Sequence, residues 1–265
     1  MASSSLEAEL ERAEALETAA LADAIESIGF DCTRCGACCK GYDSCGGSDG
    51  GNDTAERGAD ETSREREPHT ATVFPDEIRR LLDATAERGM ATGAEAGDGG
   101  ADVAVDDAAD YDWRDVARPM PYGLTEGEDG PTGETFEWAL QTDACGDCTF
   151  YREDDGEGAC AVHEDRPLVC RTYPFSVALG GTSQPMGEAV DSEGLVRAHE
   201  CEGLGREISR EDAEELASAL KERAVRELEE AIGVRDNYEP TDVDGVVVHD
   251  SEGQKRPDGT PLETE

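Results

Sequence analysis

Apolar residues recur at intervals of three and four residues near both ends of the chain. From residue 5 to residue 28, leucine, isoleucine and alanine keep this spacing and glutamate occupies the opposite face, which predicts an amphipathic helix with an N-cap among Ser3–Ser5. A second helix is predicted over 206–234, where Ser209 stands three residues before Asp212 as in a capping box. Its apolar stripe consists of Leu216, Leu220, Ala224, Leu228 and Ile232.

Between these helices the periodic pattern is weaker. Residues 41–72 and 90–110 consist mainly of small, acidic and hydroxyl side chains, a composition typical of flexible insertions. Pro75 predicts the first turn of a third helix that ends near Gly89. The aromatic residues scattered over 111–142 predict short strands or irregular structure.

The composition shows that the apolar core is small. Leu, Ile, Val and Phe together account for 41 of the 265 residues, and the formal net charge is −41. A low apolar fraction with so high a charge is typical of disordered chains. The helical stripes and ten cysteines indicate a folded part instead, so its stability must come partly from another source.

The charge also restricts the partners. The 64 Asp and Glu residues oppose 23 Lys and Arg residues, so a phosphate backbone would be repelled and we expect no nucleic-acid partner. The balance, with only three lysines, is typical of halophilic proteins in molar salt, where a Debye length of about 3 Å screens self-repulsion. An acidic, partly disordered interaction protein is the alternative.

Neither a membrane span nor an export signal is predicted. No stretch approaches eighteen apolar residues, and the first fifteen residues lack the basic and apolar regions of a secretory signal. We therefore expect a cytoplasmic protein with no membrane partner. In that compartment, ten cysteines indicate metal or redox chemistry rather than structural disulfides.

Four cysteines spell C-x2-C-x2-C-C around Gly36. This spacing suits tetrahedral Zn²⁺ and equally an iron–sulfur cluster of the 4Fe–4S type. Bacterial ferredoxins use C-x2-C-x2-C with a remote fourth ligand, and Cys170 is a candidate for that role. The four are Cys32, Cys35, Cys38 and Cys39.

The second cysteine-rich region covers residues 143–180, and several of its residues allow two interpretations. Cys145 and Cys148 are either metal ligands or a redox dithiol. His163, three residues after Cys160, is either an imidazole ligand or a surface histidine. Cys45, in the glycine-rich stretch after the first motif, is either a further ligand or a free thiol.

Two arginines flank Cys170 in a chain that has few positive charges. Arg166 and Arg171 can offset the charge of a thiolate site and orient it through hydrogen bonds. The alternative is that they pair with surface carboxylates.

Several separated blocks occur in an order that resembles the YkgJ-like cysteine-cluster family, described as zinc- or iron-chelating domains with the CxxCxxCC signature. The blocks are Phe30-x-Cys32-x2-Cys35-Gly36-x-Cys38-Cys39, Cys148-x-Phe150, Cys160, Arg166-Pro167-x2-Cys170-Arg171-x-Tyr173-Pro174-Phe175 and Cys201-x-Gly203. The resemblance extends over about residues 28–205, interrupted by the acidic insertions.

The resemblance implies a set of eight metal ligands. They are Cys32, Cys35, Cys38, Cys39, Cys148, Cys160, Cys170 and Cys201. Cys45 and Cys145 are then extra cysteines, and His163 stands where the family more often has tyrosine. Around the ligands we expect Arg166, Arg171 and Tyr173.

Together these observations predict an α-rich fold with irregular and small β elements, in which metal holds a small cysteine-cluster domain together. We expect an N-terminal helix in 1–29, the cysteine-cluster domain in 30–205 and a C-terminal helix in 206–234 that packs on it. Residues 235–265 are expected to form a disordered acidic tail with at most a small hairpin.

The expected function is metal binding, as an iron–sulfur cluster or zinc, in redox chemistry or metal handling. One alternative is a cluster-dependent enzyme that modifies a protein side chain, because flagellin lysine N-methylase carries a similar signature. No methyl-donor motif accompanies it here. Another is a structural zinc module that presents a surface to a protein partner.

Overall fold

The computed structural model describes residues 5–41, 69–90, 111–127, 130–154, 156–183, 189–191 and 194–262. In this part of the chain, six α-helices accompany twelve strands in four sheets. The prediction of an α-rich fold is therefore wrong, and the fold is mixed α/β. The strands escaped detection because they are two to six residues long, too short for a clear alternating pattern.

Most of the two predicted insertions lies outside the described residues, and so does Cys45. The last residues of the first insertion are described, and they include a strand, β1 (Thr72–Val73).

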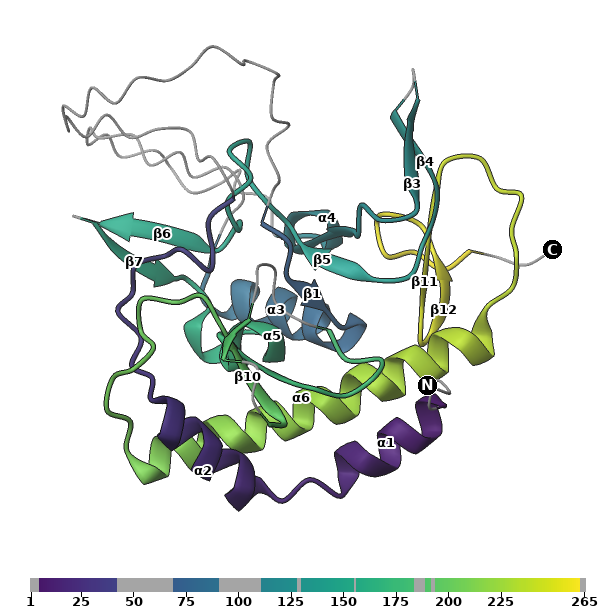
Figure 1. Ribbon diagram of the computed structural model, residues 1–265. Coiled ribbons are helices and arrows are strands. Elements are labelled where there is room, and N and C mark those ends of the chain that lie inside the picture. The colour runs from purple at the N-terminus through teal and green to yellow at the C-terminus, as the bar shows by residue number, and fades with distance from the viewer. Residues whose placement is uncertain are drawn as a thin grey trace, which may run out of the picture.

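Three helices form one side of the molecule (Figure 1). They are α1 (Leu6–Glu14), α2 (Thr18–Ile28) and α6 (Arg210–Asn237). The single helix predicted over 5–28 is divided, because the chain leaves helical geometry between Glu14 and Thr18. This break lets both short helices lie along α6 (Figure 1). The Ser5 hydroxyl caps α1 by accepting the Ala8 N–H at 3.3 Å.

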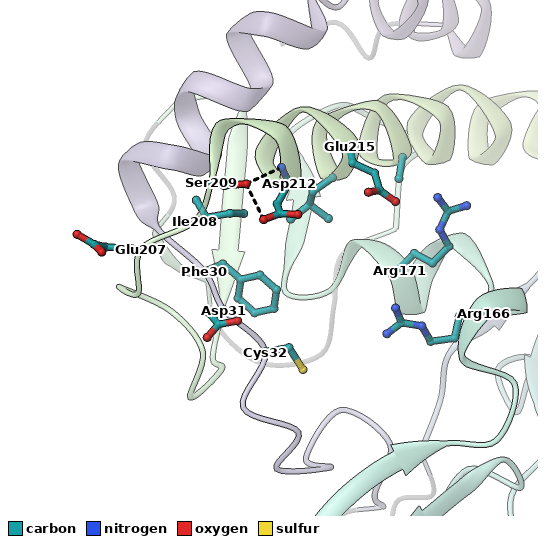
Figure 2. Close-up of a pocket in the computed structure, with 12 residues that line it drawn as sticks. Phe30, Asp31, Cys32, Arg166, Arg171, Glu207, Ile208, Ser209, Asp212 and Glu215 are labelled. Carbon is teal, nitrogen blue, oxygen red and sulfur yellow. Dashed lines mark hydrogen bonds between the residues drawn. The ribbon is translucent and has the colours of Figure 1, made fainter.

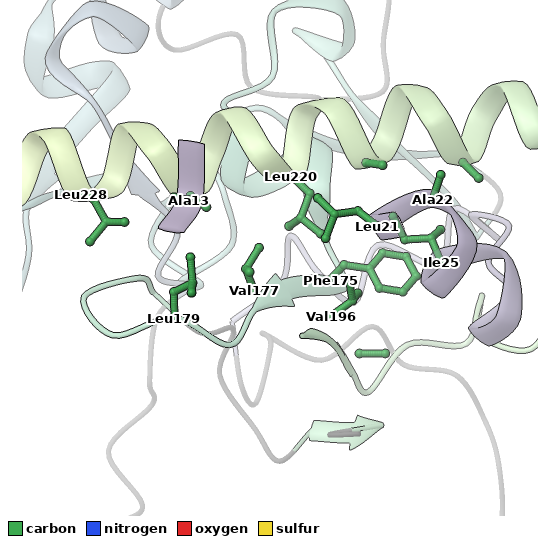
Figure 3. Close-up of a cluster of buried hydrophobic side chains, with 14 residues drawn as sticks. Ala13, Leu21, Ala22, Ile25, Phe175, Val177, Leu179, Val196, Leu220 and Leu228 are labelled. Carbon is green, nitrogen blue, oxygen red and sulfur yellow. The ribbon is translucent and has the colours of Figure 1, made fainter. Parts of the chain in front are cut away.

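The first hydrophobic core lies where these helices meet a three-stranded antiparallel sheet (Figure 3). The sheet has β10 (Val196–His199) between β8 (Phe175–Val177) and β9 (Ala189–Asp191). On α6 the buried face carries several alanines, which lets the helices approach closely. We call this cluster the helical core: Ala13, Leu21, Ala22, Ile25, Phe175, Val177, Leu179, Val196, Ala198, Ala213, Ala217, Leu220, Ala224 and Leu228.

The second hydrophobic core surrounds a sheet in which β5 (Trp138–Leu140) pairs antiparallel with β1 and with β2 (Ala117–Pro119). Helices α3 (Pro75–Glu87) and α4 (Trp113–Val116) contribute to it. Its members include large apolar side chains and one thiol, and three half-buried cysteines pack against it. We call this cluster the thiol core: Ala71, Val73, Ile78, Leu81, Val116, Ala117, Trp138, Leu140, Cys148, Phe150, Val162 and Val248, with Cys39, Cys160 and Cys170 against it.

Three short elements follow β5, and two of them carry a cysteine. Strands β6 (Tyr151–Asp154) and β7 (Glu157–Cys160) form an antiparallel hairpin. After a 3₁₀ turn at His163–Asp165, the five-residue helix α5 (Leu168–Thr172) leads into β8.

The C-terminal residues join a four-stranded sheet, so the predicted disordered tail is wrong over residues 246–262. The sheet order is β12 (Gly253–Lys255), β11 (Val246–Asp250), β4 (Gly130–Thr135) and β3 (Leu124–Gly127), with β11 parallel to β4. The buried Asp250 carboxylate accepts hydrogen bonds from Trp138 at 2.9 Å and from Lys255 at 2.7 Å. Pairing with a distant strand, which a local pattern does not reveal, orders this segment.

Within the described residues, we find no helix that combines the length and the apolar character needed to cross a membrane.

Candidate metal centre

The CxxCxxCC segment, residues 32–39, is anchored to three other parts of the chain. The first anchor is the loop that carries Cys201, where the Asp31 N–H donates to the Gly203 carbonyl at 3.0 Å. A Cβ at position 203 would lie 2.5 Å from the Asp31 carbonyl oxygen, so this approach requires glycine. The contact brings the start of the segment beside Cys201.

The second anchor is the β6–β7 hairpin. The Gly158 N–H donates to the Arg34 carbonyl at 2.7 Å. Gly36 has φ of 75° and lies against the Tyr151 ring, which fills the space that a Cβ would need. The segment therefore bends closely over the hairpin, and Cys160 stands at the end of β7 directly opposite Tyr151.

The third anchor is the loop before β6. The Cys148 N–H donates to the Cys39 carbonyl at 2.8 Å. The Gly41 N–H donates to Asp147 Oδ1, also at 2.8 Å. These two hydrogen bonds fix the end of the CxxCxxCC segment against the buried Cys148.

A buried carboxylate places Cys170. Glu77 of α3 accepts hydrogen bonds from the Leu168 N–H at 2.9 Å and from the Phe74 N–H at 3.2 Å. Burial raises the pKa of Glu77 in spite of these bonds. Because Leu168 begins α5, Glu77 fixes the start of the short helix on which Cys170 lies.

Eight cysteines are free thiols in the described residues, and they are the eight that the resemblance implies. The electrostatic effects between them define two groups that share Cys38. We call Cys38, Cys39, Cys148, Cys160 and Cys170 the inner thiols, and Cys32, Cys35 and Cys201 the outer thiols.

The inner thiols include one close pair. The Sγ atoms of Cys38 and Cys39 are 3.8 Å apart. Two thiolates on one tetrahedral ion with metal–sulfur bonds of about 2.3 Å would also be about 3.8 Å apart. Within the described residues, however, no three potential ligands are already gathered closely enough to hold an ion.

The inner thiols retain their protons strongly, with one exception. Burial raises the pKa of Cys148 to about 12 and that of Cys170 well above its ordinary value, and neighbouring thiolate charge adds to both effects. A hydrogen bond between Cys38 and Cys39 lowers the pKa of Cys38 to about 7 and raises that of Cys39. An ion that binds here must therefore displace protons.

The outer thiols are coupled to the inner ones through Cys38. Burial raises the pKa of Cys201, and the negative charges of Cys35, Cys38 and Cys32 raise it further. Cys32 is exposed, whereas Cys35 and Cys201 are half-buried. The outer group therefore lies nearer to solvent than Cys148 does.

The three residues predicted around the ligands, Arg166, Arg171 and Tyr173, contact different parts of the site. The Arg166 charge favours the thiolate forms of Cys38 and Cys160, although burial still raises the pKa of Cys160. The Tyr173 hydroxyl donates to the Glu200 carbonyl, directly before Cys201 in the chain. Arg171 lines a pocket beside Cys32.

Two further candidates, His163 and Cys145, are in a different state from the eight free thiols. His163 is exposed, and its Nδ1 lies 3.3 Å from Glu164 Oε1. Cys145 is in a disulfide, whereas Cys148 is a free thiol, so these two do not form a bonded dithiol with each other.

Glu77 and Tyr151 help to position the cysteines, and the sequence analysis missed both. Glu77 had a detectable signal, because it stands at the third position of α3 and accepts the Phe74 N–H as in a capping box. Tyr151 had none, because its contact with Gly36 joins segments more than a hundred residues apart.

Free thiols from distant parts of the chain thus converge in the manner of a metal-binding domain. Residues 125–202 match the model of the CxxCxxCC family, described as "Putative zinc- or iron-chelating domain". This match confirms, over that part of the chain, the resemblance found in the sequence. The matched range includes Cys148, Cys160, Cys170 and Cys201, whereas the CxxCxxCC segment lies before it. No curated protein and no solved structure matches the chain.

Proposed function

We propose that the chain binds zinc or single iron ions at two adjacent thiolate positions, for metal handling or redox chemistry in the cytoplasm. The observation that carries this proposal is the convergence of eight free thiols from separate parts of the chain. Soft thiolate donors suit Zn²⁺ and iron. The family description of residues 125–202 supports the same class of ligand.

The inner position would be held by Cys39, Cys148, Cys160 and Cys170. The outer position would be held by Cys32, Cys35, Cys38 and Cys201. This division gives each ion four thiolates, and it keeps the Cys38–Cys39 pair at the boundary, which agrees with the influence of Cys38 on both groups. Four thiolates form a closed tetrahedral site for zinc.

Two single ions, one on each sulfur, fit the close pair better than a 4Fe–4S cluster does. In such a cluster each cysteine binds a different iron, so neighbouring thiolates are held farther apart than on one ion. The 3.8 Å separation of the Cys38 and Cys39 sulfurs allows two ions to lie side by side, one bound by each sulfur.

The protein's own groups would prepare these positions by controlling charge and protons. Arg166 favours ionisation of Cys38 and Cys160, and so offsets part of the charge of a four-thiolate site. A bound ion would supply either a structural link between the blocks, as zinc does, or electron transfer, as iron does. Burial of Cys148 and Cys170 means that uptake releases protons and weakens at low pH.

The test is the metal and acid-labile sulfide content of the full-length protein, purified anaerobically in molar salt. We expect two ions and no sulfide per chain. Cys170→Ser should remove the inner ion, Cys201→Ser the outer ion, and His163→Ala should remove neither, because the His163 side chain is exposed and faces Glu164. Unchanged metal content in both cysteine variants would contradict the proposal. Sulfide in amounts equal to iron would replace single ions with a cluster.

A further inference from the structure

A pocket of about 270 Å³ lies beside the outer thiols, between the CxxCxxCC segment, α5 and the first turns of α6. Figure 2 shows Arg166 and Arg171 on one side, Phe30 and Cys32 on the other, and an acidic edge formed by α6. The volume is just below the range of about 300–1,000 Å³ that is usual for small-molecule sites, so a small metabolite would fill it.

The two arginines keep hydrogen-bond donors available in this pocket. Arg171 makes no ion pair or side-chain hydrogen bond within the part of the chain that the structure describes. Among the described partners, Arg166 uses only its Nε, which donates to the His163 carbonyl at 3.0 Å. The contrast with Arg210, which pairs with three carboxylates, is marked in a chain with 64 acidic residues.

The acidic edge is formed by Asp212 and Glu215 of α6. Asp212 accepts a hydrogen bond from the Ser209 hydroxyl at 2.6 Å. Among the described residues, Glu215 has no ion-pair partner and neither acid pairs with Arg166 or Arg171, although all four line the same pocket. Opposite charges therefore face the same space without neutralising each other.

Apolar side chains complete the pocket. The half-buried Phe30, Ile208 and Leu216 line it, and Ala219 forms a buried part of its wall. A ligand that fits this lining has an anionic group, a cationic group and a short apolar part.

We propose that this pocket binds a free α-amino acid as a zwitterion. Its carboxylate would accept charge-assisted hydrogen bonds from Arg166 and Arg171, the geometry that guanidinium groups favour. Its ammonium group would face Glu215 and Asp212. The side chain would contact Phe30 and Leu216, which favours an aliphatic amino acid.

The position of Cys32 in the same lining places the bound amino acid next to the outer thiols. The pocket adjoins the outer ion position and shares Cys32 with it, but the charged groups proposed to bind the amino acid are not among the proposed ion ligands.

Calorimetric titration of the full-length, metal-loaded protein with three related probes would test the proposal. L-Leucine carries both charges, 4-methylpentanoate lacks the ammonium group, and 3-methylbutylamine lacks the carboxylate. Because a hydrogen bond to a charged group contributes at least about a factor of ten in affinity, we expect each truncated probe to bind at least about tenfold more weakly than leucine.

Two variants and a matched control locate the site. Arg171→Gln and Glu215→Gln should each weaken leucine binding at least about tenfold. Arg235→Gln removes an arginine from the other end of α6, where it pairs with Glu7, and should leave leucine binding unchanged. Metal content, measured on the same samples, should stay constant in all three.

Three results would overturn the inference: no binding of leucine, alanine or glutamate; equal binding of leucine and 4-methylpentanoate; or equal weakening by Arg235→Gln. The second would identify a simple anion site. If the full-length protein binds leucine but holds no metal, only the proposed ion positions would be contradicted.

Discussion

The helical core and the thiol core are stabilised by different means. The helical core buries aliphatic side chains and alanines from three helices and a small sheet. The thiol core combines strands of two or three residues and aromatic rings with cysteines, whose thiols are held in their protonated form by burial. Packing of apolar side chains therefore suffices for one half of the fold, whereas the other half contains groups suited to an additional ligand.

Helix α6 connects the two halves, because it packs on α1 and α2 in one half and on α5 and β11 in the other. Arg223, buried on α6, donates to the Thr172 hydroxyl of α5 at 3.0 Å and to the Phe175 carbonyl at 3.2 Å. Arg226 pairs with Asp76 of α3. The degree to which the two halves are coupled can therefore be measured by following both in the same sample.

Removal of the metal should produce the largest difference in stability between the two cores. Structural zinc contributes about 10–16 kcal/mol to small domains, as much as the whole stability of a typical protein. In chelator we expect the amides of Cys39, Cys148 and Gly158 to lose protection from hydrogen exchange, while the buried middle of α6 keeps most of its protection.

Re-addition of zinc to the same sample should restore the lost protection, which controls for irreversible damage. Unchanged exchange at these three amides in chelator would show that the thiol core does not depend on metal. Equal loss in α6 would show that the two cores unfold together.

A substitution that creates a cavity in the helical core should lower stability and leave the thiol core with its metal. Leu220 is fully buried on α6, and Leu→Ala substitutions at such sites cost about 3–5 kcal/mol. Leu220→Ala should therefore lower the free energy of unfolding by about that amount without changing the metal content. Leu124→Ala, at a half-exposed position of β3, is the matched control and should cost much less. A loss of metal in Leu220→Ala would show that the cores are coupled.

The smallest expected effect concerns the pH dependence of stability, which should have opposite directions in the metal-free and the metal-loaded protein. Burial raises the pKa of Cys148 to about 12 from an ordinary value of 9.0, so the folded metal-free protein keeps a proton that the unfolded chain releases. This stabilisation is complete below pH 9 and is lost as the pH rises towards 12. Between pH 7 and pH 10, Cys148 alone should contribute a loss of about 1.5 kcal/mol.

The metal-loaded protein should instead lose stability on acidification, because protons compete with the ion for the thiolates. Denaturant titrations with and without chelator between pH 6 and pH 10 measure both trends. Parallel pH curves for the two forms would contradict this prediction.

The same comparison explains how much of the fold could be predicted. The helical core depends on repeats within single segments, so residues such as Leu216 and Leu220 predicted α6 and Ser209 predicted its start. The division of the first helix between Glu14 and Thr18 was missed, because it depends on packing against α6, about two hundred residues away.

The thiol core could be predicted as a set of residues but not as a structure. Cysteine spacing and the family resemblance selected all eight free thiols. Their division into two groups depends on long-range contacts, such as that of Cys148 with Cys39. The disulfide of Cys145 and the pairing of β11 with β4 were missed for the same reason.

The position of α6 near the end of the chain has a consequence for synthesis on the ribosome. At about 5–20 residues per second, roughly 10–40 s separate the appearance of α2, which ends at Ile28, from that of α6, which begins at Arg210. Every cysteine precedes Arg210. The growing chain therefore exposes most of its thiols to the cell's metal supply before the helix that completes the helical core has been made.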